Sequence, residues 1–337
     1  MQYRQGGGGF MSKRFKGPDA KAVVGIKFDS ESRDLFIAAC QLCAKTGMSL
    51  RVVHITQNIL SRWIYRDEAY YEQLLGGREF ADITSDLRDE SIQRARQKME
   101  DFLAENPSPV VGEYHIVAST DPAEALLADA VAQHASLLIV GINKERHGFF
   151  QRDLSTAINI MAITPIPVLI LPEGLNFQKD SYKVLVADNL SPDGEQAFNC
   201  GASLATALTH SDVMHTHVID YSFKDLVARL EFIKTDDALT SQSPQELWAL
   251  AEQRAYEALL ERANGLPHLI EAVGGHYKQL VLTGDVPEEL DQALKHFKPD
   301  LVVFGRPHQQ RRLFRLGSLA LHVLHARTYG VLIAPPM

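Results

Sequence analysis

The sequence is poor in cysteine, which bears on several classes of protein. Three cysteines in 337 residues are too few for a disulfide framework. Cys40 and Cys43 form a C-x-x-C motif inside an apolar helical run, and no second pair completes a zinc site. We therefore interpret both cysteines as packing residues, since small buried thiols are common in helices.

Long hydrophobic runs and an excess of basic charge are also missing. No apolar run approaches the roughly 18 residues that a membrane span needs. No signal peptide with a basic start and an apolar middle is present either, so we expect a cytoplasmic protein with no membrane partner. The net charge is −8, from 34 Lys and Arg against 42 Asp and Glu, which argues against a nucleic-acid partner.

Catalytic signatures are absent from the sequence. There is no G-x4-G-K-(S/T) loop and no G-x-S-x-G elbow, and the 13 histidines lack metal-ligand spacing. We predict no catalytic residue and no metal site. His54 and His217 recur at the end of the second strand of each half of the chain. We interpret them as structural residues that satisfy the same backbone group twice.

Two stretches of the chain share a layout that suits phosphate binding, at residues 136–170 and 282–335. In each, an apolar strand ends at a glycine, a helical run begins after a loop, and a short apolar strand follows. A glycine lets the backbone approach a ligand, and the free N–H groups at a helix start attract an anion. The repeat predicts an architecture that was duplicated.

The alternation of strands and helices around these stretches predicts two α/β domains. Each half reads β-α-β-α-β-α-β-α-β, the pattern of an open parallel sheet with helices on both faces. In such sheets the ligand crevice lies beyond the carboxyl ends of the strands. We expect a disordered tail at residues 1–20, a first domain at 21–172, a linker at 173–182 and a second domain at 183–337. The role of an aromatic-rich insertion at residues 63–80 stays open.

Several segments carry a resemblance to a known family. They are V-L-V-A-D, T-H-V-I-D, T-G-D-V-P-E-E, D-L-V-V-F-G, and a G-S pair followed by a helix and V-L-I. With this series in order, the chain resembles a tandem universal stress protein. The resemblance implies two Rossmann-like domains of the adenine nucleotide alpha hydrolase-like type. It also implies binding and signalling more than turnover.

The ATP-binding members of this family carry G-x2-G-x9-G-(S/T) after the fourth strand, and neither half matches that motif in full. The second half keeps Gly305, Gly317 and Ser318, but has His308 at the middle glycine and a loop one residue shorter. The first half has Leu154 where backbone would approach a phosphate. We also align Lys27 of the first half with a strand-end acid of the second, and predict that the first half binds no nucleotide.

The resemblance implies a nucleotide site in the second half alone. The base would be contacted by the strand-end acid Asp188 and by Val218 at the end of the next strand. The ribose would be contacted by Phe304 and Gly305 at the end of the fourth strand. The phosphates would be contacted by the loop and helix start, at Arg306, His308, Gly317 and Ser318.

Two functions from different classes remain open at this point. The first is a non-catalytic stress-response binding and signalling protein that needs no cofactor, has an unknown protein partner, and packs its two domains as an internal pseudo-dimer. The second is a sensor that binds ATP, with magnesium, or a related small anion in the second half, with or without slow hydrolysis. A homodimer is compatible with both, because the apolar final strand of each half would otherwise leave an open edge.

Overall fold

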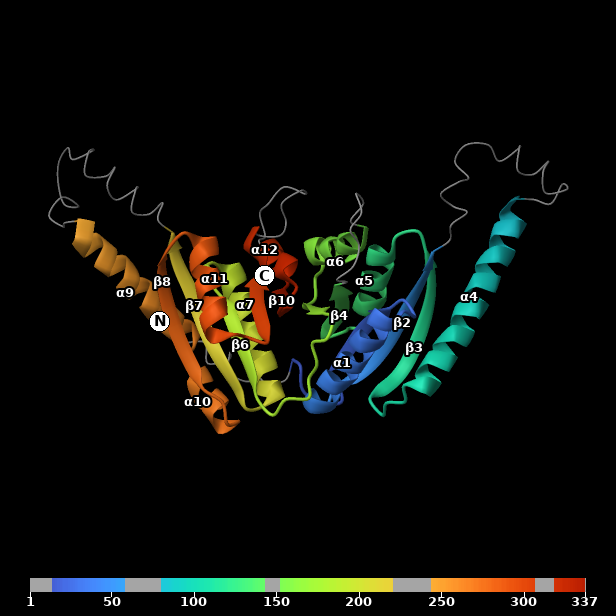
Figure 1. Ribbon diagram of the computed structural model, residues 1–337, viewed down its shortest axis with the longest axis horizontal. Helices are drawn as coiled ribbons and strands as arrows, with labels where there is room; N and C mark the ends of the chain where they lie inside the picture. Colours follow the sequence, from blue (N-terminus) through green and yellow to red (C-terminus); the bar gives the residue numbers. More distant parts are fainter. Residues whose placement is uncertain (1–13, 58–79, 143–151, 221–243, 307–317, 337) are drawn as a thin grey trace, which may run out of the picture. The chain divides into compact units, whose positions relative to one another are not determined.

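The computed structural model describes residues 14–57, 80–142, 152–220, 244–306 and 318–336. The chain forms two compact units. The first unit covers residues 15–178, and the second covers residues 179–337 together with Arg14. Each unit is an α/β structure (Figure 1), which confirms the predicted fold class. Most of the insertion at residues 63–80 and part of the predicted phosphate loop lie outside the described residues.

The first unit contains five strands and the helices that connect them. In chain order these are β1 Lys21–Ile26, α1 Ser30–Thr46, β2 Ser49–Gln57, α4 Phe80–Glu105, β3 Val111–Ser119, α5 Pro122–Ala132, β4 Leu137–Ile142, α6 Arg152–Ile163 and β5 Val168–Pro172. The strand order is β3-β2-β1-β4-β5, and every neighbouring pair is parallel.

The second unit repeats this arrangement with one extra short helix. Its elements are β6 Tyr182–Ala187, α7 Pro192–Leu208, β7 Ser211–Asp220, α9 Pro244–Arg262, α10 Leu266–Ala272, β8 Tyr277–Gly284, α11 Val286–Phe297, β9 Leu301–Gly305, α12 Ser318–Ala326 and β10 Gly330–Ala334. The strand order is β10-β9-β6-β7-β8, again with parallel pairs. The chain runs from β6 outward to β8 and then crosses to β9, so the order reverses between β6 and β9.

Helices cover both faces of each sheet. In the first unit, the rings of Phe36 on α1 and Phe102 on α4 meet at 5.2 Å, which places both helices on one face, and α5 and α6 pack together on the other. In the second unit, His322 on α12 bonds Asp291 on α11, so these two helices share a face. Because both faces are covered, the central strands are apolar and buried along nearly their whole length.

Most helix starts follow the capping signals in the sequence. The side chains of Asp29, Asp121, Ser191 and Asp285 cap α1, α5, α7 and α11, each accepting a bond from a backbone N–H in the first turn. These caps fix where the chain leaves each strand and enters the next helix. The groups beyond the strand ends are thereby held in defined positions.

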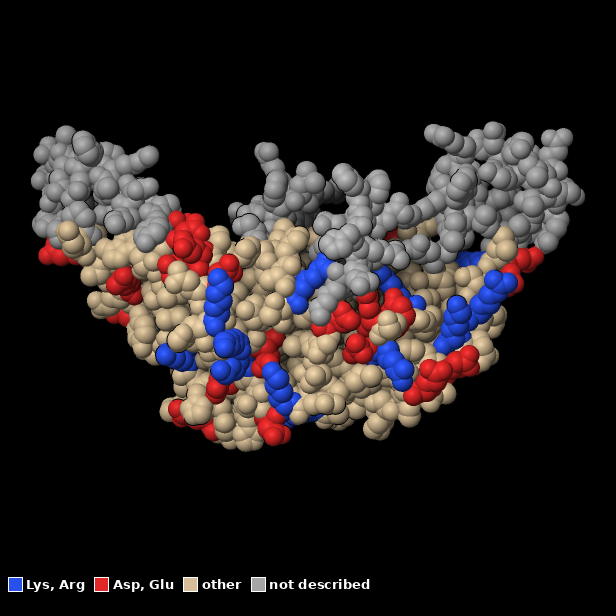
Figure 2. Space-filling model, in the orientation of Figure 1, with Lys and Arg blue, Asp and Glu red and all other residues tan. Residues whose placement is uncertain are grey.

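The surface carries charges of both signs. On the face drawn in Figure 2, basic and acidic side chains of the described residues are interspersed, and no single area is wholly basic. No helix in the described parts of the chain is long and apolar enough to cross a membrane.

Candidate functional site

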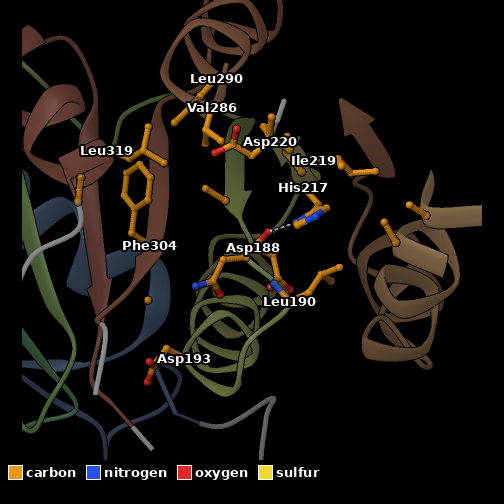
Figure 3. A pocket seen from close by; sticks show the side chains of 18 of the residues that line it. Asp188, Leu190, Asp193, His217, Ile219, Asp220, Val286, Leu290, Phe304 and Leu319 are labelled. Atoms are coloured by element: carbon orange, nitrogen blue, oxygen red, sulfur yellow. Dashed lines mark hydrogen bonds between the residues drawn. The ribbon is translucent and has the colours of Figure 1, made fainter. Parts of the chain in front are cut away.

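A cavity of about 600 Å³ lies in the second unit, beyond the carboxyl ends of β6, β7 and β9. This is the place where the strand order reverses, and ligands bind there in open α/β sheets. Residues of α7, α9, α11 and α12 complete the walls, so that residues from seven elements converge (Figure 3). The lining is mostly aliphatic, with the ring of Phe304 on one side and polar groups from β6, β7 and α9.

The structure brings four of the predicted nucleotide-binding residues to this cavity, namely Asp188, Val218, Phe304 and Gly305. Arg306 follows β9, and its backbone N–H donates to the carbonyl of Ala334 at 3.2 Å, but Arg306 is not part of the lining. Ser318 begins α12, and the two residues after it reach the cavity. His308 and Gly317 lie outside the described residues.

Gly305 also meets a packing requirement. A Cβ atom at this position would lie 2.2 Å from the backbone oxygen of Asp193, in the first turn of α7. The missing side chain therefore lets β9 pack against the start of α7. Gly305 lines the cavity as well, and the approach of its backbone to a ligand stays a prediction.

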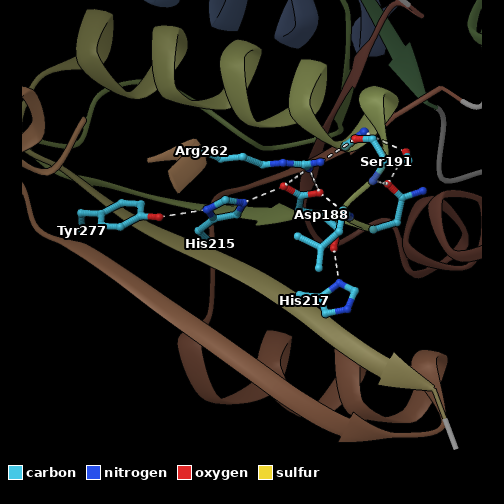
Figure 4. A network of polar contacts seen from close by, with 9 residues as sticks. Asp188, Ser191, His215, His217, Arg262 and Tyr277 are labelled. Carbon is cyan, nitrogen blue, oxygen red and sulfur yellow. Dashed lines mark hydrogen bonds and ion pairs between the residues drawn. The ribbon is translucent and has the colours of Figure 1, made fainter. Parts of the chain in front are cut away.

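The carboxylate of Asp188 is held by protein groups on the floor of this region (Figure 4). His215 Nε2 lies 2.9 Å from Oδ2, and Arg262 Nη1 contacts both oxygens, 2.7 Å from Oδ2. Tyr277 bonds the far nitrogen of His215 at 2.9 Å. Arg262 also donates to the carbonyl of Ser191, the N-cap of α7, at 3.0 Å. We call Asp188, His215, Arg262 and Tyr277 the buried polar network.

The charges in the buried polar network follow from burial and hydrogen bonding. Burial alone would raise the pKa of Asp188, but the bonds from His215 and Arg262 outweigh it and hold the pKa below its usual value. Burial lowers the pKa of His215 despite the neighbouring carboxylate, so the imidazole is neutral at pH 7. Burial raises the pKa of Tyr277 to about 12. One ion pair, Asp188 with Arg262, is thus bridged to a neutral histidine and a neutral phenol.

The hydrogen-bond directions in this network are then determined. A carboxylate only accepts, so His215 Nε2 carries the proton and donates to Asp188. His215 Nδ1 accepts from the hydroxyl of Tyr277. The ring of Phe198 stacks on His215 with centroids 4.3 Å apart and excludes water from this side. The network ties β6, β7, β8, α7 and α9 together, and we find no group in it that is placed to act on a substrate.

The paired histidines behave as the sequence predicted. His54 Nδ1 lies 2.8 Å from the carbonyl of Ile26, and His217 Nδ1 lies 2.8 Å from the carbonyl of Asp188. In both units the histidine therefore bonds a backbone carbonyl where the neighbouring strand ends, at the last residue of β1 and at the residue after β6. This confirms the structural interpretation.

The same contacts correct one alignment between the halves. Ile26 pairs with His54, and Ala187 pairs with the residue before His217, so Asp188 stands opposite His217 as Ile26 stands opposite His54. The next positions agree, since Phe28 and Leu190 both have positive φ, at 64° and 59°. The counterpart of the strand-end acid is thus Ile26, and the prediction of Lys27 was one residue off.

The first unit has an apolar interior where the second has the buried polar network. Ile26 corresponds to Asp188 and Val52 to His215, and both are buried. Phe102 corresponds to Arg262, because the buried residues of α4 that precede it match those of α9. A separate space of about 10 Å³ lies between α1 and the ends of β4 and β5.

The first unit carries its own buried charge, on the opposite face of the sheet. Arg51 follows Leu50 on β2 and is 7% exposed. Its Nε and Nη2 donate to the two carboxylate oxygens of Asp129 on α5, both at 2.9 Å, and Nη1 lies 2.8 Å from Glu113. His115 Nδ1 also bonds Asp129 at 2.6 Å. Burial opposes these bonds, yet the Arg51 contact keeps the pKa of Asp129 below its usual value.

Few sequence features point to either set of charges. His215 was visible only as part of an alternating His-x-His on a strand, and Arg262 lies at the end of a helix far along the chain from Asp188. A charged residue inside an otherwise apolar strand, such as Arg51, is the one pattern that could have marked a buried pair. Cys43 is buried and burial raises its pKa to about 12, in keeping with a packing role.

Metal ligands do not gather in the described parts of the chain, where no three His, Cys, Asp or Glu side chains are close enough to hold an ion.

Comparison with solved structures places the fold. A universal stress protein from Archaeoglobus fulgidus DSM 4304 matches with a TM-score of 0.55 and 13% identity, covering 96% of this chain and 98% of that one. A functionally unknown protein from Pseudomonas aeruginosa PAO1 matches with a TM-score of 0.56 and 14% identity, covering 94% and 92%. At these identities the likeness concerns the fold alone.

Sequence comparison is more limited. No curated protein matches the chain significantly. Residues 182–335 match the model of the Universal stress protein family. The second half of the chain therefore contains a universal stress protein domain.

Proposed function

We propose that the chain is a non-catalytic binding protein that senses a nucleotide or a related small ligand in the cavity of the second unit. The observation that carries this proposal is the cavity of about 600 Å³ at the reversal of strand order, beside an ion pair that already satisfies the strand-end acid. A volume of this size suits a ligand as large as a nucleoside. The lack of a reactive group in the buried polar network favours binding over turnover.

The residues present fit a nucleotide in two respects. The aliphatic walls and the ring of Phe304 suit a base, and the start of α12 offers free N–H groups for an anion at the cavity edge. The resemblance implies that Asp188 contacts the base. In this chain its carboxylate is already bonded by His215 and Arg262. We assign no magnesium ligand to the described residues, so magnesium enters only as the counterion of ATP.

Sensing requires that the ligand affect an element that a partner could read, and α9 is such an element. Ala251, Arg254 and Ala255 of this helix line the cavity, and Arg262 at its end is bonded to Asp188. A ligand in the cavity would contact the first part of α9 while the last part stays fixed to the sheet. Binding would thus favour one position of the helix over others.

Calorimetric titration with ATP, ADP and adenosine tests the proposal, together with native mass spectrometry for retained nucleotide. Ala251→Trp places an indole at the cavity wall, whereas Ala249→Trp places the same group on an exposed position of the same helix. We expect micromolar binding that Ala251→Trp weakens at least about 100-fold, or about 2.7 kcal/mol, and that Ala249→Trp leaves unchanged. Binding by no nucleotide, or equal loss in both variants, would contradict the proposal.

The tandem organisation is a second part of the proposal, supported by the repeated fold of the two units. We propose two universal stress protein domains that pair as an internal pseudo-dimer through their apolar final strands, in a cytoplasmic protein whose partner is another protein. Cross-linking mass spectrometry of the full chain tests the pairing. Links between the ends of β5 and β10 are expected, and links that join other edges instead would refute it.

A further inference from the structure

Helix α9 carries an apolar stripe on a side that faces solvent. Tyr256 and Leu260 lie one turn apart on this helix and are 50% and 55% exposed, which makes them the two most exposed large apolar side chains among the described residues. Ala249, two turns before Tyr256, is exposed on the same side. A different side of α9 packs on the sheet, where Ala255 and Leu259 are buried.

The equivalent helix of the first unit shows that the fold does not require this stripe. Ala95 and Met99 of α4 are buried and match the two buried residues that anchor α9. In this alignment the stripe of α9 corresponds to three charged residues of α4, namely Asp89, Arg96 and Glu100, and all three are exposed. The two helices hold the same place in the same fold. An apolar stripe on only one of them therefore indicates contact with another molecule.

The charges beside the stripe have one sign. Four exposed glutamates of α9 flank it, namely Glu246, Glu252, Glu257 and Glu261. The two basic residues of α9 are engaged elsewhere, because Arg254 lines the cavity and Arg262 bonds Asp188. The solvent-facing side of α9 is thus apolar along its centre and acidic along its rim. We call it the α9 surface.

We infer that the α9 surface is a docking site for a partner protein that presents apolar side chains flanked by Lys and Arg, as a basic amphipathic helix does. The apolar side chains of such a helix would pack on Tyr256 and Leu260, while its basic residues approach the glutamates. A second copy of this chain fits less well, since two α9 surfaces would bring glutamates together. Nucleic acids and anionic membranes are disfavoured by the same charge.

One helix connects the α9 surface with the cavity. Ala251, Arg254 and Ala255 line the cavity from one side of α9, and the apolar stripe lies on another side. A ligand that changes the position of α9 would therefore change the surface that the partner contacts. This link rests on the proposed function, whereas the docking surface itself does not.

Two synthetic amphipathic helices with the same leucine stripe, one flanked by lysine and one by glutamate, test the surface by fluorescence anisotropy with the full chain. We expect the lysine peptide to bind at least about tenfold more tightly than the glutamate peptide. Tyr256→Arg with Leu260→Glu gives α9 the side chains of α4 at unchanged net charge, and should weaken the lysine peptide at least about tenfold. No binding of the lysine peptide, or equal binding by this variant, would overturn the inference.

Matched single and double variants separate the apolar centre from the acidic rim. Tyr256→Ala should weaken the lysine peptide at least about threefold, whereas Arg96→Ala at the equivalent position of α4 should leave it unchanged. Glu257→Lys with Glu261→Lys should reduce the preference for lysine over glutamate at least about fivefold. Equal losses in Tyr256→Ala and Arg96→Ala, or an unchanged preference in the double lysine variant, would contradict the docking site.

The same peptides distinguish this inference from the proposed function. Saturating ATP should change the affinity for the lysine peptide at least about fivefold, and Ala251→Trp should abolish that change. If no nucleotide binds, the proposed function fails, and binding of the lysine peptide would still support the α9 surface. Sedimentation that shows self-association through Tyr256 and Leu260 would identify a second copy as the occupant and overturn the inference.

Discussion

The two units build nearly the same backbone around interiors of opposite character. Where the second unit holds Asp188, His215 and Arg262, the first holds apolar residues, and where the first buries Arg51 against Asp129, the second has Met214 and Ala293. Among the described residues, each unit thus has an ion pair where the other is uncharged, and the two pairs lie on opposite faces of their respective sheets. The fold itself requires neither pair, because for each face of the sheet one of the two units has uncharged residues at the equivalent positions.

The position of the charge bears on the ligand site. In the second unit the ion pair lies under the strand ends that line the cavity, and it fixes α9 by its last turn. In the first unit the pair lies between β2 and α5, while the rings of Phe28, His54 and Phe102 pack together near the ends of β1 and β2. Among the described residues, the strand ends that border the cavity of the second unit thus carry a polar network, and the corresponding strand ends of the first unit carry aromatic rings.

The largest expected effect comes from breaking the pair in the second unit. Asp188→Ile copies the first unit at one position but leaves the partly buried guanidinium of Arg262 without its carboxylate, and should lower the free energy of unfolding by about 3 kcal/mol. The triple variant with His215→Val and Arg262→Phe added has the residues of the first unit at all three positions. It should regain most of the lost free energy of unfolding. In a Trp63→Phe background, Trp248 on α9 is the one tryptophan and reports urea unfolding of this unit. A triple variant as unstable as Asp188→Ile would show that the two interiors are not interchangeable.

The reverse exchange applies to the first unit. Arg51→Met leaves the carboxylate of Asp129 without the guanidinium and should lower the free energy of unfolding by about 2–3 kcal/mol. The loss stays below that of a carboxylate left with no partner, because His115 still bonds Asp129. Arg51→Met with Asp129→Ala reproduces Met214 and Ala293, and should be more stable than Arg51→Met alone. In a Trp248→Phe background, Trp63 is the remaining tryptophan to follow unfolding. Additive losses would mean that the two residues act independently.

Lowering the pH should destabilise the second unit more when His215 is present than when the triple variant has replaced it. Burial lowers the pKa of His215, so the unfolded chain binds a proton on this residue before the folded chain does. Stability of the second unit must therefore fall as pH drops below about 6.5, the value for an unfolded histidine. The triple variant lacks His215 and should lose less stability between pH 7.5 and pH 5.0. Urea titrations at both pH values measure the free energy of unfolding. If the unaltered protein and the triple variant lose the same amount between pH 7.5 and pH 5.0, a group other than His215 causes the pH dependence.

The smallest expected effect concerns the hydroxyl in the cavity. Thr216 corresponds to Val53 in the first unit, and both are buried. Because the Thr216 hydroxyl has no partner among the described residues, Thr216→Val should change the free energy of unfolding by less than about 0.5 kcal/mol. Binding of adenosine should weaken, since the ligand loses a hydrogen bond. A destabilised protein would show instead that the hydroxyl is bonded within the fold.

Much of the fold could be predicted from the sequence, because its signals are local. Short apolar runs and caps such as Asp29 and Asp285 gave the order of strands and helices, and the parallel arrangement followed. Strand lengths were less well predicted. The edge strand β8 runs from Tyr277 to Gly284, longer than its apolar stretch at residues 279–282, because an edge strand needs fewer apolar residues. The short helix α10 was not predicted, and it has no side-chain cap.

The candidate site could be predicted only in part. The strand ends at Asp188, Val218, Gly284 and Gly305 were expected to converge, since parallel strands end on one edge. Three of them line one cavity, whereas Gly284, at the end of the edge strand β8, is not among the lining residues. The partner of Asp188 was not predictable, because Arg262 reaches it through the packing of α9 on the sheet. Nor could a sequence show that Gly305 meets a backbone oxygen of α7. These contacts depend on distances between elements, which local patterns do not contain.

The central claim is that the second unit has a ligand site and the first does not. Hydrogen–deuterium exchange of the full chain, with and without saturating ATP or adenosine, tests it without any substitution. We predict slower exchange in residues 216–220 of β7 and in α9, and unchanged exchange in residues 53–57 of β2 and in α4. Protection in the first unit, or in both units alike, would contradict the account.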